Sequence, residues 1–309
     1  MRKIENRETI NGYLYQCNVV KKITGENSKN PGTPFFSGNL DIAVDEKGLN
    51  VISVHFTYVA PQYFSGKTNN NFAILERIVE SPERTWVSGG KESAFKLNVD
   101  ASLALNDFYN AQNVLVSSKR NEASFISIVN ELKPESERNT FRTDMVITKV
   151  KRVEADPERY IDKDYVIVGG AVFDFRNALL PVEFAVRNES AMNYFEDLSP
   201  SSREPVFTKV WGRINSTTKR VEKREESAFG EDAITTYERT SREWVITGAA
   251  KVPYEFDNDS EDLTVAELTK AQQDREVYLA DVKKRQDEWT SKKVSPHGVT
   301  VKESDGFDF

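Results

Sequence analysis

A repeated order of short alternating strands constrains this chain more than any other feature of its sequence. Apolar and polar side chains alternate with the period of a half-buried β-strand in three early segments, residues 13–23, 36–44 and 51–59. A loop with two prolines and two glycines separates the first two segments. The inward face of the third segment is expected to carry Ile52, Val54, Phe56 and Tyr58. These segments predict a β-meander with one buried face.

The same plan occurs twice along the chain. A helix-like segment at residues 72–79 and two strand candidates at 94–105 and 114–132 complete the first copy. The second copy has five strand candidates, with a short helix-like segment at 191–198 after the third: residues 143–153, 165–175, 180–186, 207–214 and 234–252. Three strands, a helix and two strands are the order of the OB-fold. We therefore expect a mainly β protein with two tandem OB-like five-stranded barrels.

The predicted domains follow from this repeat. Residues 1–136 form the first barrel and residues 137–256 the second. Residues 257–294 form an acidic linker and a long helix, and residues 295–309 a flexible acidic tail. Polar side chains interrupt the apolar seam of the helix, so it would be a weak coiled coil. Packing onto a barrel and contact with a partner or second copy both stay open, as does the oligomeric state.

Composition narrows the class of protein. The chain starts with alternating charges and has no run of 18 apolar residues, so we expect no signal peptide and no membrane partner. Its one cysteine, Cys17, lies among alternating apolar residues, which favours a small core side chain over a reactive thiol. These features favour a cytoplasmic location.

Nothing in the sequence indicates an enzyme. Two histidines and one cysteine are too few for a His/Cys metal cluster, and no nucleotide-binding or hydrolase motif occurs. Gly169 and Gly170 fall inside a strand, where they indicate a bulge rather than a phosphate-binding loop. We predict no catalytic residue, no metal site and no cofactor.

Charge is segregated along the chain. The net charge is −7, yet residues 207–224 contain six basic residues and one acid. Period-two alternation places Phe207, Lys209, Trp211 and Arg213 on one strand face. The neighbouring basic run consists of Lys219, Arg220, Lys223 and Arg224. Aromatic rings interleaved with cations suit stacked bases and phosphates, so this face is the predicted single-strand nucleic-acid site. The alternative is that Phe207 and Trp211 point into the barrel.

The first barrel offers less on its sheet. Its expected outward side chains are poor in aromatics and cations: Ser37, Asn39, Asp41, Ser53, His55 and Thr57. Any contribution to binding would come from a loop that carries Tyr63, Phe64 and Lys67. An ordinary exposed loop is the alternative interpretation.

The final residues add a family resemblance. Together with the repeated barrel pattern, the sequence Glu303-Ser-Asp-Gly-Phe-Asp-Phe309 resembles single-stranded-DNA-binding proteins of bacteria and their phages, which commonly end in an acidic tip with a final Phe. The resemblance implies that the tip recruits replication and recombination proteins. The residues concerned are Asp305, Phe307, Asp308 and Phe309. Two barrels and a long helix before the tip depart from the usual family pattern, and a phage-type member fits best.

We therefore predict a phage-encoded protein that coats single-stranded DNA in the host cytoplasm. The sequence does not decide whether DNA or RNA is preferred. Two alternatives stay open, a tandem-barrel structural protein of a virion and a modulator that binds a host protein.

Overall fold

Ten strands form one continuous sheet in the described part of the chain. The computed structural model describes residues 4–110, 112–156, 159, 161–225, 227, 229, 233–257 and 263–294. Along the sheet, the strands follow the order β2-β3-β5-β4-β1-β6-β7-β8-β10-β9, and two further pairings, β2–β1 and β6–β9, close it on itself twice. The mainly β prediction is confirmed.

The first barrel contains five strands: β1 (Asn6–Ile23), β2 (Pro34–Ala43), β3 (Val51–Val59), β4 (Lys96–Tyr109) and β5 (Leu115–Ile128). Three short helices lie between β3 and β4: α1 (Asn70–Val79), η1 (Pro82–Arg84) and α2 (Trp86–Gly89). Strand β3 pairs with β5 in parallel, and the other neighbours are antiparallel. The closed order β1-β2-β3-β5-β4 is that of an OB-type barrel.

The second barrel repeats this topology after the short helix η2 (Glu135–Glu137). It contains β6 (Asn139–Val153), β7 (Tyr165–Phe173), β8 (Leu179–Val186), β9 (Val206–Glu225) and β10 (Ala233–Ala249), with α3 (Glu189–Asp197) after the third strand. Strand β8 pairs with β10 in parallel. The predicted pair of OB-like barrels is therefore confirmed. Gly169 and Gly170 lie in β7, opposite a register shift between Ile147 and Lys149 of β6. This irregularity agrees with the bulge that the two glycines indicated.

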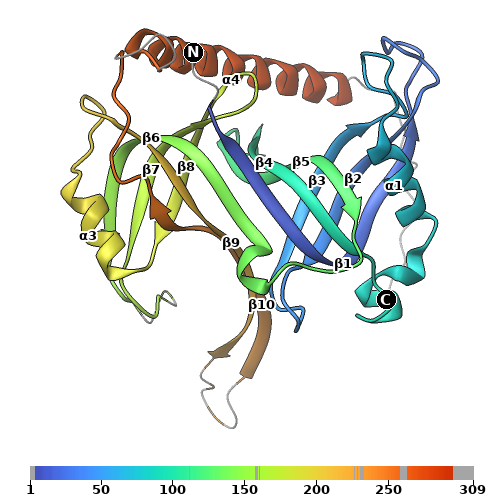
Figure 1. Cartoon of the computed structure of the whole chain (residues 1–309), viewed down its shortest axis with the longest axis horizontal. Helices are drawn as coiled ribbons and strands as arrows, with labels where there is room; N and C mark the ends of the chain where they lie inside the picture. The colour runs from blue at the N-terminus through green and yellow to red at the C-terminus, as the bar shows by residue number, and fades with distance from the viewer. Residues whose placement is uncertain are drawn as a thin grey trace, which may run out of the picture.

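The two barrels share a backbone seam and a core. Residues 6–10 of β1 pair with residues 139–143 of β6, so the sheet runs from one barrel into the other. Across this seam, buried Ile10 and Phe141 belong to one apolar cluster. The indole nitrogen of Trp244, on β10, donates a hydrogen bond of 2.8 Å to the carboxyl of Glu8, on β1. Figure 1 shows the barrels side by side with this seam between them.

Helix α4 (Val265–Val294) lies across both barrels (Figure 1). Leu268 and Ala271 pack with Phe173 and Phe207 of the second barrel. On the first barrel, Arg275 binds Asp107 through two hydrogen bonds of 2.7 Å. Of the two alternatives for this helix, the structure thus shows the first, packing onto the barrels. No helix in the described ranges is long and apolar enough to cross a membrane.

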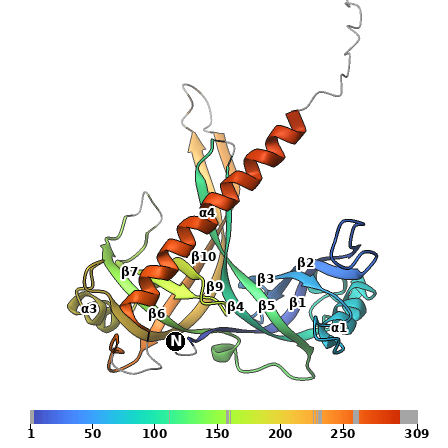
Figure 2. The ribbon, with the colours of Figure 1, turned by 90° about the horizontal axis from the view of Figure 1, so that it is seen from above.

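Strands β9 and β10 extend far beyond the barrel wall. The sequence predicted a strand that ends at residue 214, whereas β9 continues to residue 225 and stays paired with β10 as far as Ala233. We call the outer part, residues 217–225 and 233–241, the arm. It projects from the body in Figures 1 and 2.

Candidate nucleic-acid interface

A β-bulge turns an aromatic ring outward on the first barrel. Phe36 of β2 lies opposite Val59 of β3, and Gly38 lies opposite Phe56. Two steps along β2 therefore correspond to three steps along β3. The extra residue in β3 places Val59 in the core and leaves Tyr58 48% exposed. The prediction that Tyr58 points inward was therefore wrong, because a bulge reverses the alternation after Phe56.

Tyr58 and Phe35 form an exposed aromatic pair. Their ring centroids lie 4.7 Å apart with an interplanar angle of 34°, and Phe35 is half-buried on the neighbouring strand. The pair lies where β2 begins and β3 ends, at the opening from which two loops leave the barrel. Such a pair offers a π-surface on which bases can stack.

The two loops at this opening contact each other through a cation and a ring. Lys29, from the β1–β2 loop, places its ammonium group 4.3 Å from the ring centroid of Phe64, in the β3–α1 loop. The side chain of Phe64 is 85% exposed and that of Tyr63 42%. Tyr63 donates its backbone N–H to the carbonyl of Lys67, which closes the loop. The three predicted loop residues are thus exposed at the surface.

A polar cleft of about 340 Å³ follows where the arm meets the first barrel. One wall comes from β2, β3, β4 and β5, and the other from β9 and β10. Its lining residues are Asn39, Ile52, Ser53, His55, Asn106, Ser118, Lys119, Arg120, Asn121, Ile214, Asn215, Ser216, Arg242 and Trp244. Asn39 and His55 also join the cleft to the β2–β3 face, because the Asn39 amide oxygen lies 2.7 Å from the His55 Nδ1.

The cleft is electropositive. Three of its residues are cations, and no carboxylate of the described residues lines it. Arg242 is exposed and forms no ion pair with any described residue, whereas Arg120 lies 3.1 Å from Glu122. Lys119 donates to the Glu183 carbonyl at 2.6 Å, and burial lowers its pKa. Burial also lowers the pKa of His55, so that imidazole is neutral at pH 7. In a chain of net charge −7, this cleft thus gathers three cations.

Trp244 forms the floor of the cleft. It is 3% exposed, and the Lys119 ammonium lies 4.8 Å from its ring centroid. Beneath it, burial raises the pKa of Glu8 to about 8, an effect that the hydrogen bond from Trp244 partly offsets. Glu8 is therefore mostly protonated at pH 7 and does not oppose the cations above it.

Phe207 does not lie on the exposed face that the alternation predicted. It is fully buried, and its ring packs against Tyr254 and Phe256 with centroid separations of 5.0 and 5.8 Å. The period-two pattern is present, but the segment after β10 and the start of α4 cover this end of the strand. No base can reach Phe207 in this arrangement, so its predicted exposure is corrected.

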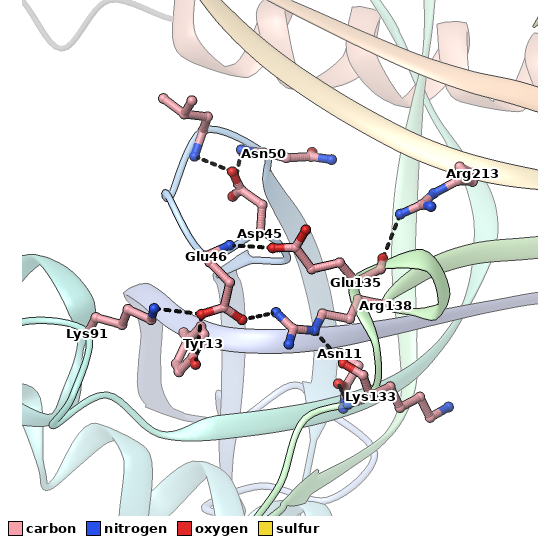
Figure 3. A network of polar contacts seen from close by, with 11 residues as sticks. Asn11, Tyr13, Asp45, Glu46, Asn50, Lys91, Lys133, Glu135, Arg138 and Arg213 are labelled. Carbon is pink, nitrogen blue, oxygen red and sulfur yellow. Dashed lines mark hydrogen bonds and ion pairs between the residues drawn. The ribbon is translucent and has the colours of Figure 1, made fainter.

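Lys209 and Arg213 lie on the outer face of β9, where both have protein partners. The Lys209 ammonium lies 2.8 Å from Glu5 and 3.8 Å from Asp144, and the hydrogen bond to Glu5 raises the pKa of the lysine. Arg213 donates to the Glu135 carbonyl at 2.7 Å, within the network of Figure 3. Fewer positive charges are thus free on this face than the sequence indicated.

The network of Figure 3 ties the connection between the barrels to the first barrel. Glu46 accepts bonds of 2.6 Å from both Lys91 and Arg138, and these cations lower its pKa to about 2. The Glu46 backbone N–H donates to the carboxylate of Glu135 at 2.9 Å. Arg213 therefore positions the second barrel, and its guanidinium is held close to the body of the protein.

Trp211 remains the exposed aromatic of this strand. It is 38% exposed, and its indole lies against Gly248 of β10, where any side chain would overlap the ring. Its cross-strand neighbour on β6 is Arg142, which is exposed. Trp211 and Arg142 therefore provide a ring and a cation at the surface, on the second barrel.

The remaining predicted residues can be placed only in part. The structure describes only the backbone of the basic run, which lies in the β9 half of the arm: Lys219, Arg220, Lys223 and Arg224. The acidic tip, with Asp305, Phe307, Asp308 and Phe309, lies outside the described residues. Within the described part of the chain, no group of three His, Cys, Asp or Glu side chains could hold a metal ion.

Sequence reasoning missed the aromatic pair and the cleft. Consecutive rings at Phe35 and Phe36 gave a signal for the pair, since only one of two neighbours in a strand can enter the core. The cleft gave no local signal, because residues such as Asn121 and Arg242 come from different barrels.

The chain thus belongs to the class of proteins built from OB-type barrels. It has two five-stranded barrels in a single sheet, with a cationic cleft between them. The chain belongs to the YorF family, whose family model matches residues 5–285. None of the curated proteins compared with the chain matches it. Two similar solved structures are the wild-type single-stranded DNA binding protein from Thermus aquaticus and a deletion mutant of it, both with 13% identity and a TM-score of 0.46. The matches cover 84% of this chain and 98% and 100% of those chains.

Proposed function

We propose that this chain is a non-enzymatic single-stranded DNA-binding protein. The observation that carries the proposal is one outward surface that joins rings to cations. It starts at the Phe35–Tyr58 pair, passes Asn39 and His55 on the same two strands, and enters the cleft that holds Arg242. Flexible single strands present bases and phosphates together, and this surface offers a partner to each.

The length of this surface suits several nucleotides. Asn39 lies four positions after Phe35 on β2, a distance of roughly 13 Å along a strand. The second barrel adds the exposed ring of Trp211 on the other face of the β9–β10 ribbon, and the arm carries the basic run. We propose that both barrels, residues 1–136 and 137–256, contact the same strand.

Titration of the protein with labelled oligo-dT, oligo-rU and a duplex of equal length tests this function. We expect saturable binding of oligo-dT that weakens as salt rises, because phosphate neutralisation releases counterions. A duplex should bind more weakly, since its bases cannot stack on the rings. Comparison with oligo-rU decides between DNA and RNA. If no single strand binds at low salt, the proposal fails and the virion-protein and host-modulator alternatives gain weight.

We further propose that the tip, residues 303–309, recruits replication and recombination proteins, as the family resemblance implies for a phage-encoded protein in its host cytoplasm. Deletion of the tip should slightly tighten binding of single strands at low salt, because its acids no longer compete for the cations, and the gain should fade as salt rises. The same deletion should abolish capture of such partners. Weaker DNA binding with partner capture intact would contradict a docking role.

A further inference from the structure

One histidine ring forms part of the lining of the cleft between the barrels. His55 lies on β3, and its side chain is half-buried. Its Nδ1 lies 2.7 Å from the amide oxygen of Asn39 on β2. An amide oxygen can only accept a hydrogen bond, so Nδ1 must carry the proton that is donated. The contact with Asn39 therefore fixes the tautomer of the ring.

The second ring nitrogen, Nε2, lies at the end of the ring that is farther from the backbone. It forms no hydrogen bond with any described residue. Several polar atoms of the described residues are buried without a partner, but Nε2 of His55 is not one of them, so this nitrogen is accessible. Because His55 lines the cleft with the outer end of its ring free, a ligand in the cleft can reach Nε2.

Charge determines what this nitrogen can bind. Burial lowers the pKa of the imidazole, Glu122 of β5 opposes this shift, and Arg120 of β5 and Lys22 of β1 reinforce it. The ring is therefore neutral at pH 7. With the proton on Nδ1, the lone pair of the neutral ring lies on Nε2, which is a hydrogen-bond acceptor.

A neutral acceptor among cations matches a nucleotide better than a phosphate alone. Arg242 and Lys119 line the same cleft, and cations of this kind donate to phosphate oxygens. A phosphate diester has no proton to donate to Nε2. The edge of a base does carry N–H donors, among them N3–H of thymine. A volume of about 340 Å³ lies within the range of small-molecule sites.

We propose that His55 binds the edge of a base in this cleft, with a base N–H donating to Nε2 while Asn39 holds the ring in the required tautomer. The inference rests on the proposed function where the base belongs to a bound strand, which would continue from the Phe35–Tyr58 pair along the same two strands. A free nucleotide carries the same N–H, so the experiment needs an arm for each source.

Nitrogen resonances of the imidazole rings test the tautomer directly, because the chain has only two histidines, His55 and His297. In protein labelled with ¹⁵N-histidine at pH 7, His55 should show a protonated Nδ1 and an unprotonated Nε2, and His297→Phe assigns the resonances. Oligo-dT should shift the Nε2 resonance of His55. A strand built from N3-methylthymidine, which lacks the N–H, should shift it less. Asn39→Ala should populate the other tautomer as well.

Affinities of the same two strands measure the contact. Wild-type protein should bind the methylated strand about two- to tenfold more weakly than oligo-dT, the value of one neutral hydrogen bond. His55→Phe keeps an aromatic ring and should bind both strands equally, and Asn39→Ala should reduce the ratio in part. The matched control is His297→Phe, the same substitution at the other histidine, which should keep the wild-type ratio. If His55→Phe does not fold, Asn39→Ala and the resonances decide.

Thymidine 5′-monophosphate provides the free-nucleotide arm. Displacement of oligo-dT at millimolar concentration, together with a shift of the Nε2 resonance, supports a site that also accepts free nucleotides. If the nucleotide does neither while the methylation ratio still depends on His55, the same site is supported with the strand as the only source.

Three results overturn the inference. They are an Nε2 that carries the proton in free wild-type protein, equal binding of the two strands by wild-type protein, and a full methylation ratio in His55→Phe. In each case binding of oligo-dT persists, so the proposed function stands while the base site fails. If wild-type protein binds no single strand, the proposed function fails instead, and a shift of Nε2 by thymidine 5′-monophosphate would still support the base site.

Discussion

The two barrels have the same topology and differ in the chemistry of their outer faces. On the second and third strands of the first barrel, the outer face carries the aromatic pair and leads into a cleft that no carboxylate of the described residues lines. The corresponding strands of the second barrel are β7 and β8, and their outer positions include Gly169, Pro181 and Glu183. A shared fold therefore does not give the two barrels a shared role, since function depends on the side chains of the site.

Three cations on the second barrel lie beside acids. Lys149 lies 3.4 Å from Glu183, and two arginines form closer pairs of 2.7 and 2.6 Å, Arg152 with Glu196 and Arg187 with Glu243. Exposed pairs of this kind contribute little to stability. They also reduce the positive charge available to a phosphate. Under the proposed function, we therefore expect the first barrel to provide most of the binding energy.

The barrels also have related clefts with different contents. In each, residues from the last two strands of one barrel and from the second and third strands of the other contribute to the lining. The cleft on the second barrel, of about 400 Å³, is lined by Glu183 and by Lys119, which donates to the Glu183 carbonyl. On the first barrel, the corresponding cleft contains the exposed Arg242, which forms no ion pair with any described residue.

The largest expected effect lies at the seam that both barrels share. Burial raises the pKa of Glu8 from 4.5 to about 8, so the folded protein keeps a proton that the unfolded chain loses. The free energy of unfolding should therefore fall as pH rises from about 4.5 to about 8, by on the order of 4 kcal/mol, and the Glu8 contribution should be constant outside that window. Glu8→Gln should remove this dependence while keeping the bond from Trp244. Urea denaturation at pH 5, 7 and 9 measures it, and parallel profiles for the two proteins would contradict the assignment.

The next effect distinguishes the two barrel surfaces directly. Phe35→Ala combined with Tyr58→Ala should weaken oligo-dT binding by about 1–3 kcal/mol for each base that loses its stacking partner. Phe175→Ala removes a more accessible ring, 85% exposed in the β7–β8 turn, and should leave affinity unchanged. Equal losses in the two variants would mean that the barrels contribute alike. Melting curves for both variants control for stability.

Trp211→Ala tests whether the second barrel contributes a stacking ring at all. If its exposed indole stacks on a base, affinity should fall by on the order of 1–3 kcal/mol. Loss of the contact with Gly248 should cost less stability than the roughly 3–5 kcal/mol of a fully buried aromatic. A large loss of stability with normal affinity in the folded fraction would assign Trp211 to the core instead.

The smallest effect at physiological salt is expected from the arm. Changing Lys219, Arg220, Lys223 and Arg224 together to Ala should reduce the slope of log affinity against log salt by up to about 3, if each contacts a phosphate of a single strand. The matched control is Lys149→Ala, which removes a cation that already has an acidic partner. An unchanged slope in the arm variant would exclude the basic run from the site.

Local patterns were sufficient to predict the order of the elements. Alternation and turn residues predicted both copies of the strand plan. The pattern of α4 also predicted that polar side chains interrupt its apolar seam. Two of these, Arg275 and Gln286, form polar contacts with the first barrel. Such signals are local because they reflect which face of one element is buried.

The candidate site was less predictable, because it depends on contacts between distant segments. Tyr58 was assigned to the wrong face by a bulge that only the partner strand reveals. Phe207 has the expected period, yet Tyr254 and Phe256, almost 50 residues later, cover it. β9 was predicted too short, because alternating Lys, Arg and Glu in a free-standing hairpin lack the apolar face on which strand prediction relies.

The seam between β1 and β6 has a consequence for how tightly the barrels could act together. Two binding modules on a flexible linker hold each other at an effective concentration that the linker length dilutes. Here ladder hydrogen bonds, the Trp244–Glu8 contact and α4 hold the modules in one orientation. No linker entropy is then lost when a strand that occupies the first barrel reaches the second. Avidity would be set by how far the nucleic acid itself must bend.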